Sequence, residues 1–214
     1  MILYLTQREK GLTSADFELT DGTYLLGTSH LDGSLMSMDG IWDITCFDRH
    51  LRMERIGSGK ARNLLQFKGE AYRPYAITEG NRQIGIICHT SAGGLFSRYG
   101  YHRLRFDGQE LESYSIGLGK EGVRVAIRNA DKQLAQVERE ARVINDLYAY
   151  TLYVENGIDP IPTVVDTLYT YVLSGFQPGR KVEKSVSIKY AKTTNKALLS
   201  KLDKGFSEHI RRNQ

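Results

Sequence analysis

One stretch near the C-terminus limits what this chain can fold into. Residues 159–176 read DPIPTVVDTLYTYVLSGF, and Asp166 is the only charge among the 15 residues 162–176. Asp159 is typical of a helix start and Gly175 of a helix end. Fifteen residues make roughly 22 Å of helix, whereas a bilayer core needs about 20 apolar residues. A helix that is apolar on all sides and too short for a membrane is expected to be buried inside the protein.

The rest of the sequence predicts a β-protein. Apolar and polar residues alternate with a period of two in many short stretches, which is typical of strands. Turn signals separate the stretches, among them Asp21-Gly22, Gly80-Asn81 and Asp107-Gly108. About a dozen strands can be counted, the number found in a large barrel or sandwich. A buried helix among so many strands predicts a sheet that closes around it.

Asp166 needs an explanation of its own, because it is a charge on a surface otherwise suited to burial. A buried carboxylate requires a partner or a shifted pKa. Two interpretations stay open. The side chain either caps backbone groups or pairs with an arginine from a strand, or it faces water at the mouth of the barrel.

Charge divides the chain into two regions. From Gln177 onward there are ten Lys and Arg against three Asp and Glu, a net charge of +7. Residues 1–176 carry 19 basic and 22 acidic side chains, a net charge of −3. We therefore expect a β-barrel domain over residues 1–176 and a basic C-terminal extension over residues 177–214.

The extension contains two patterns. VEKSVSIKYAK alternates from Val186 to Tyr190 and predicts a strand. Further on, apolar residues recur every four positions and predict an amphipathic helix, namely Leu198, Leu202, Phe206 and Ile210. Gly205 weakens this helix by ~1 kcal/mol relative to alanine. Such a stripe suits a membrane interface, an apolar patch on the barrel or a second subunit.

The remaining motifs argue against an enzyme, a cofactor or a metal site. GLGKEG, residues 117–122, spells a dinucleotide fingerprint, but the strand-like VRVAIR follows it where a helix would be required. Cys88 and His89 are adjacent, so they point to opposite faces of a strand. No serine has the context of a hydrolase nucleophile. With two cysteines and no signal-peptide pattern at the N-terminus, a cytoplasmic location is expected, with peripheral contact to a membrane.

The order of motifs from about Ser113 to Phe176 resembles the tubby C-terminal-like superfamily, which includes tubby domains, plant LURP-one-related proteins, phospholipid scramblases and bacterial relatives. The motifs are a glycine turn, a strand, a polar turn, a second strand, an Asp-x-Tyr strand and the apolar helix. They lie at Gly117, Gly119, Gly122, Leu134 to Val137, Asp146 and Tyr148. The resemblance implies a closed antiparallel barrel of about a dozen strands around a central apolar helix. This chain lacks the cysteine clusters of the scramblases and continues for 38 residues beyond the helix.

Two functions follow as hypotheses. The first is a non-enzymatic, tubby-like module that docks on anionic phospholipid, since tubby domains bind phosphoinositides through basic side chains. Its candidate contacts are Lys196, Lys201, Lys204, Arg211 and Arg212, and each basic residue near an anionic surface adds ~1 kcal/mol. The alternative is a regulatory protein-interaction module, or a small-ligand binder, whose basic tail docks on a partner protein or on nucleic acid.

Overall fold

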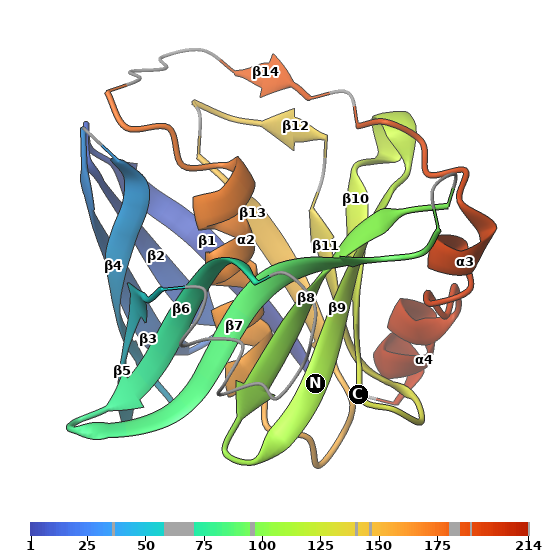
Figure 1. The fold of residues 1–214 in the computed structure, drawn as a ribbon, viewed down its shortest axis with the longest axis horizontal. Helices are drawn as coiled ribbons and strands as arrows, with labels where there is room; N and C mark the ends of the chain where they lie inside the picture. Colours follow the sequence, from blue (N-terminus) through green and yellow to red (C-terminus); the bar gives the residue numbers. More distant parts are fainter. Residues whose placement is uncertain are drawn as a thin grey trace.

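The chain is mainly β, and twelve of its strands form a closed antiparallel barrel (Figure 1). This confirms the expected class and strand number. The computed structural model describes residues 1–35, 37–57, 71–94, 97–139, 141–145, 147–179, 185–188 and 190–213.

Neighbouring strands of the barrel follow one another along the chain. They are β1 (Ile2–Lys10), β2 (Ser14–Thr20), β3 (Leu25–Ser34), β4 (Ser37–Cys46), β5 (Arg49–Arg55), β6 (Tyr72–Glu79), β7 (Arg82–Ala92), β8 (Tyr99–Phe106), β9 (Gln109–Gly117), β10 (Val123–Arg128), β11 (Gln133–Arg139) and β13 (Ala149–Val154). The barrel closes because β13 pairs with both β11 and β1. Outside it, β12 (Arg142–Val143) pairs with β14 (Val186–Ser187) in a sheet of two strands.

The glycine-rich segment 117–122 joins β9 to β10 through a single 3-10 turn, η1 (Gly119–Glu121). The expected strand-to-strand connection is therefore confirmed. Gly119 and Gly122 have φ values of 72° and 99°, a region that residues with a Cβ rarely adopt. At Gly122 a Cβ would also lie 2.1 Å from the carbonyl oxygen of Arg139, so this turn packs tightly on the end of β11.

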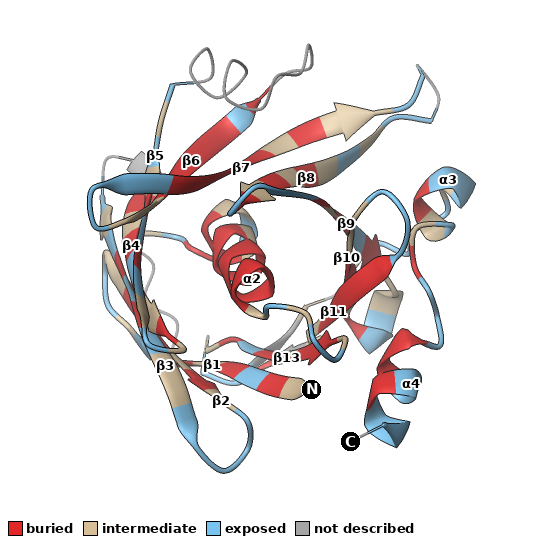
Figure 2. Cartoon of the chain, turned by 90° about the horizontal axis from the view of Figure 1, so that it is seen from below, coloured by how far each residue is buried: buried red, intermediate tan, exposed pale blue. Residues whose placement is uncertain are grey.

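The apolar segment forms α2 (Ile161–Ser174). Asp159 Oδ1 accepts a hydrogen bond of 2.9 Å from the backbone N–H of Ile161, and Gly175 follows the helix as its C-cap. Figure 2 shows α2 inside the ring of strands. In the described part of the chain, no helix combines the length and the apolar character needed to cross a bilayer.

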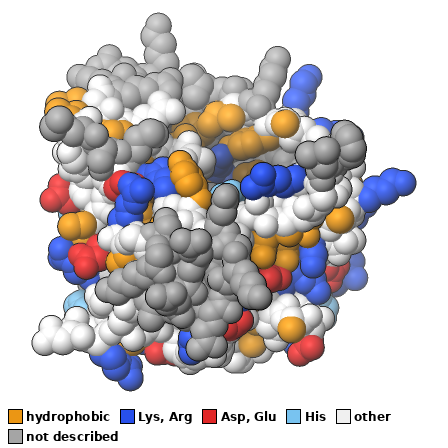
Figure 3. Space-filling view, in the orientation of Figure 1, with side chains coloured by type: hydrophobic (Ala, Val, Ile, Leu, Met, Phe, Trp, Pro, Cys, Tyr) orange, Lys and Arg blue, Asp and Glu red, His pale blue; other side chains and the backbone are white. Residues whose placement is uncertain are grey.

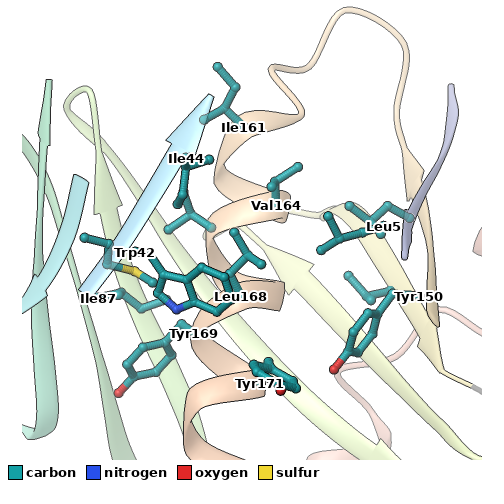
Figure 4. Packing of buried hydrophobic residues seen from close by; sticks show 14 of the residues in the cluster. Leu5, Trp42, Ile44, Ile87, Tyr150, Ile161, Val164, Leu168, Tyr169 and Tyr171 are labelled. Carbon is teal, nitrogen blue, oxygen red and sulfur yellow. The ribbon is translucent and has the colours of Figure 1, made fainter. Parts of the chain in front are cut away.

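Aromatic and aliphatic side chains pack α2 against the barrel wall. Leu168 and Val172 are fully buried, as the sequence predicts. Figure 4 shows Leu168 beside Trp42 of β4. Tyr171 meets the ring of Phe17 from β2 edge to face, with centroids 5.0 Å apart, a favoured arrangement of two aromatic rings.

The extension forms two short helices where the sequence predicts one. They are α3 (Lys196–Leu199) and α4 (Phe206–Arg212). The chain turns between them, where Asp203 Oδ1 accepts a hydrogen bond of 2.9 Å from the N–H of Gly205. Figure 2 shows both helices outside the ring of strands. Because the barrel wall is curved, two short helices follow it more closely than one straight helix.

The apolar stripe of the extension covers the outer face of the barrel. Leu198 and Leu202 pack on side chains of β9 and β10, namely Tyr114, Ile116 and Ala126. Phe206 and Ile210 pack on Tyr153 of β13. Of the three locations that the sequence leaves open for the stripe, the structure therefore selects the barrel.

Truncating α2 should weaken the whole barrel. We expect Leu168→Ala to lower the free energy of unfolding by ~2–5 kcal/mol, because it leaves a cavity in the core. The exposed Leu12, whose side chain is 59% accessible, supplies the control, and Leu12→Ala should change stability by less than about 0.5 kcal/mol. Urea denaturation measures both free energies of unfolding. A loss below about 1 kcal/mol for Leu168→Ala would show that the packing of this side chain does not stabilise the barrel.

Candidate functional site

A cavity of about 240 Å³ lies between α2 and the wall made by β9, β10, β11 and β13. Strand alternation places its wall residues, because every second side chain points into the barrel. The cavity is lined by Ser115, Val123, Val125, Val137, Arg139 and Tyr150 from the strands, by Asp166, Thr167, Thr170 and Ser174 from α2, and by Tyr190 from the extension. Small side chains on the strands therefore leave space beside the polar side of the helix.

Arg139 is the basic residue of this cavity, and the register of β11 directs it inward. Val125 pairs with the buried Val137, and Val123 pairs with Arg139. The guanidinium lies among three tyrosine rings, with its Cζ 4.9 Å from the centroid of Tyr148, 5.1 Å from that of Tyr190 and 5.8 Å from that of Tyr150. A cation over aromatic faces is stabilised by the ring quadrupoles.

The polar atoms at this end of the cavity lack partners. Arg139 Nε and Nη1 are buried, as are the hydroxyls of Tyr150 and Tyr190, and none of them forms a hydrogen bond of good geometry among the described residues. The Arg139 and Tyr150 side chains still lie close enough to interact with each other. Burying donors without acceptors costs about 1–3 kcal/mol each, and more for a charged group. Such a cluster of unused donors is what an anionic ligand would satisfy.

At neutral pH, Arg139 and Tyr150 both carry the protons that they need to act as hydrogen-bond donors. Burial lowers the pKa of Arg139, and the neighbouring tyrosines raise it by more, so the guanidinium stays charged. Burial raises the pKa of Tyr150 to about 12, against the opposing effect of Arg139. The Tyr150 hydroxyl therefore keeps its proton and can donate it to a hydrogen bond.

Asp166 forms the opposite side of the cavity. Its side chain is 1% exposed, with Oδ1 2.8 Å from Nδ1 of His102 and Oδ2 accepting a hydrogen bond of 2.7 Å from Ser113. The open question from the sequence is thus answered: the partners are a histidine on β8 and a serine on β9, rather than an arginine or water. The two strands hold the carboxylate in a fixed orientation.

Three hydroxyls of α2 complete the helix side of the cavity, and each donates a hydrogen bond to a carbonyl oxygen of the same helix. Thr167, Thr170 and Ser174 donate to the carbonyl oxygens four residues earlier, at 2.7, 2.8 and 2.9 Å. Their oxygen lone pairs stay able to accept. The helix side of the cavity therefore presents acceptors, whereas the Arg139 end presents donors.

Solvent reaches this region from outside. Ser115 and Ser174 are exposed although they line the cavity. Arg139, Tyr150 and Val123 also line an outer depression of about 560 Å³, so they stand at the boundary between the interior and the surface. In Figure 3, Lys and Arg side chains border a hollow with hydrophobic side chains in the upper part of the face.

The extension closes one side of the cavity. The N–H of Tyr190 donates to the carbonyl of Gly119 at 3.3 Å, and the N–H of Thr193 donates to that of Gly117 at 2.9 Å. A Cβ at Gly117 would lie 2.1 Å from the carbonyl oxygen of Ala191. Glycine at this position thus lets the extension lie flat on the barrel and brings the Tyr190 ring to Arg139.

His102, Ser113 and Asp166 do not form a nucleophile–base pair. Ser113 and His102 both bind the Asp166 carboxylate, so in this arrangement the histidine does not act as a base on the serine, as nucleophilic catalysis requires. Burial raises the pKa of Cys46 to about 12 and that of Cys88 to about 11, so both thiols stay protonated. Among the described residues, no three His, Cys, Asp or Glu side chains are placed to hold a metal ion.

The five basic residues predicted as an anionic contact differ in their surroundings. Arg211 donates to the Tyr153 hydroxyl, Lys201 Nζ lies 5.0 Å from the ring centroid of Tyr114, and Arg212 lies 3.7 Å from Glu208. Lys196 and Lys204 are exposed on the surface of the extension. None of the five lines the cavity beside α2. Arg211 shares the outer depression of about 560 Å³ with Arg139, whereas the other four do not line it.

Comparison with known proteins finds no matching family model, no similar curated protein and no similar solved structure. The resemblance to tubby C-terminal-like proteins therefore stays a prediction that rests on the order of motifs in the sequence.

Sequence reasoning missed Arg139, although a signal for it was present. In the stretch AQVER, Ala135 and Val137 occupy one face of the strand, and Arg139 continues that face. A charge at an inward position of a predicted strand is the signal, but the hydrophobic pattern alone does not tell which face is inward.

Arg139 should add little to the stability of the free protein. We expect Arg139→Met to leave the free energy of unfolding unchanged or to raise it by about 1–3 kcal/mol, because it removes a buried charge with unused N–H groups. Arg124→Met is the control. Arg124 pairs with Glu138 at 3.3 Å on the outer face, and losing this pair should change the free energy of unfolding by less than about 1 kcal/mol. If chemical denaturation shows that Arg139→Met costs more than about 2 kcal/mol, the guanidinium serves the fold instead of a ligand.

Proposed function

We propose that this protein is a non-enzymatic binding module that holds a small anionic molecule inside its barrel, next to α2. The observation behind the proposal is the half-buried Arg139, whose buried Nε and Nη1 form no hydrogen bond of good geometry among the described residues, beside two buried tyrosine hydroxyls in the same condition. A carboxylate or phosphate accepts two parallel hydrogen bonds from a guanidinium, and it would satisfy all of these donors.

The valine side chains on the strands support a ligand that is more than a bare ion. Val123, Val125 and Val137 give the cavity an apolar wall, and ligand sites typically combine such walls with a few placed polar groups. The proposed ligand therefore carries an anionic group for Arg139 and a small apolar body. The barrel with α2 along its axis, as the tubby-like resemblance implies, is the scaffold in this proposal.

Thermal unfolding with small anions tests the proposal. The probes are short carboxylates with and without a second polar group, and inorganic phosphate. A binder present at about 100 times its Kd adds about 2.7 kcal/mol of stability, which raises the Tm of a chain of this size by about 5–10 °C. Arg139→Met should abolish the shift, and Arg124→Met should keep it. If no probe shifts the Tm, or if every shift survives Arg139→Met, Arg139 is not an anion site.

The basic extension supports a second, separate proposal, which is contact with an anionic phospholipid surface. Its net charge of +7 contrasts with −3 for residues 1–176. Because the apolar stripe is buried on the barrel, this contact would be electrostatic, without insertion into the bilayer. Lys196 and Lys204 are its best candidates, since both are exposed.

Vesicle sedimentation at low salt separates this contact from binding inside the barrel. We expect weak binding to vesicles with anionic lipid and none to neutral vesicles, because each lysine contributes ~1 kcal/mol. The pair Lys196→Glu and Lys204→Glu should remove most of the binding, while Arg139→Met should leave it intact. Equal sedimentation of the double variant and the unchanged protein would exclude these lysines as the contact.

A further inference from the structure

The proposed anion site leaves one side of the cavity unexplained, the side formed by α2. The Arg139 end presents unused donors, whereas α2 presents the Asp166 carboxylate and the hydroxyl oxygens of Thr170 and Ser174. A ligand with only an anionic group would satisfy the first set and bring its negative charge towards Asp166. A ligand that fits both sides of the cavity would therefore carry an acceptor for the Arg139 end and a donor for the α2 side.

Asp166 is built to receive a donor. Each of its oxygens accepts one hydrogen bond, from Ser113 or at the His102 ring nitrogen, and a carboxylate has about four lone-pair sites. The fixed orientation leaves acceptor capacity on the carboxylate of a residue that lines the cavity. An ammonium or another N–H donor would use that capacity, and a positive charge would offset the burial of the carboxylate.

The hydroxyls of α2 point to the same chemistry. Thr170 donates its proton to the carbonyl oxygen of Asp166, and Ser174 donates to that of Thr170. Both hydroxyls can therefore meet a ligand only as acceptors. Together with Asp166 they form an acceptor surface along one side of the helix.

The size of the cavity limits the ligand. A volume of about 240 Å³, filled at the packing density of a protein interior, holds roughly ten non-hydrogen atoms. Phospholipids and long fatty acids are too large to be enclosed. A short chain with a charged group at each end fits, with the valine wall beside its middle.

We infer that the cavity binds a small zwitterion, an amino carboxylate with its carboxylate at Arg139 and its ammonium group at Asp166. The inference rests on the proposed function and adds a second specificity-determining residue to it. Asp166 distinguishes an amino carboxylate from the carboxylate that lacks the amine, because only the former supplies a donor to the helix side.

Matched pairs of probes test the inference on the unaltered protein. The probes are the ω-amino carboxylates from 3-aminopropanoate to 6-aminohexanoate, each beside the plain carboxylate of the same chain length, with binding measured by calorimetry. We expect at least one amino carboxylate to bind ten times more tightly than its plain counterpart. If plain carboxylates bind as tightly at every length and depend on Arg139, the inference is wrong and the anion site stands. If neither kind of carboxylate binds, both the proposed anion site and the inferred preference for a zwitterion are wrong.

Variants then assign the preference to Asp166. Asp166→Asn keeps the shape of the side chain but removes its charge, and it should reduce the preference for the amine at least fivefold. The control is Asp159→Asn, which changes an aspartate at the start of the same helix and should keep the preference. A preference that is unchanged in a folded Asp166→Asn protein would overturn the role of Asp166. If that variant does not fold, the matched probes decide the question alone.

Discussion

The need to remove α2 from water explains the architecture of the whole protein. A helix with so much apolar surface has to be removed from water, and the closed ring of strands does this. The few polar residues of the helix, among them Asp166 and Thr170, lie where β9 and β10 present serines and valines. Because these side chains are short, they do not fill the distance between wall and helix, and the cavity is the space that remains.

Because the barrel is closed, placing a charge on its inner face is energetically unfavourable. The inward position of Arg139 therefore points to a function other than stabilising the fold. Charged N–H groups that are buried without well-formed hydrogen bonds, as Nε and Nη1 of Arg139 are, are unfavourable, and the rings of Tyr148 and Tyr190 offset only part of that cost. Features that disfavour the free protein and would favour a complex are typical of binding sites. By contrast, each oxygen of Asp166 already has one partner, His102 or Ser113, which fixes the carboxylate and still leaves it able to accept further hydrogen bonds.

The C-terminal extension connects the inner and the outer surface. Its helices cover Tyr114 and Tyr153 on the outside of the barrel, and between them and α2 the chain carries Tyr190 to the guanidinium of Arg139. A segment that looks like a solvated basic tail by charge alone thus completes the wall of the cavity. Lys196 and Lys204 of the same extension stay exposed, as the proposed contact with phospholipid requires.

Local patterns in the sequence determined the secondary-structure elements. Alternation with a period of two predicted the strands, and the Gly117–Gly122 turn joins two of them. The apolar run between Asp159 and Gly175 predicted a buried helix. These features depend on neighbours in the chain, and so they can be derived from it. Tertiary structure alone decided that His102 and Ser113 meet Asp166, that Arg139 faces inward beside Tyr190, and that the amphipathic stripe lies on the barrel. Each of these contacts joins residues dozens of positions apart, and strand register and barrel closure, which no local pattern specifies, bring them together.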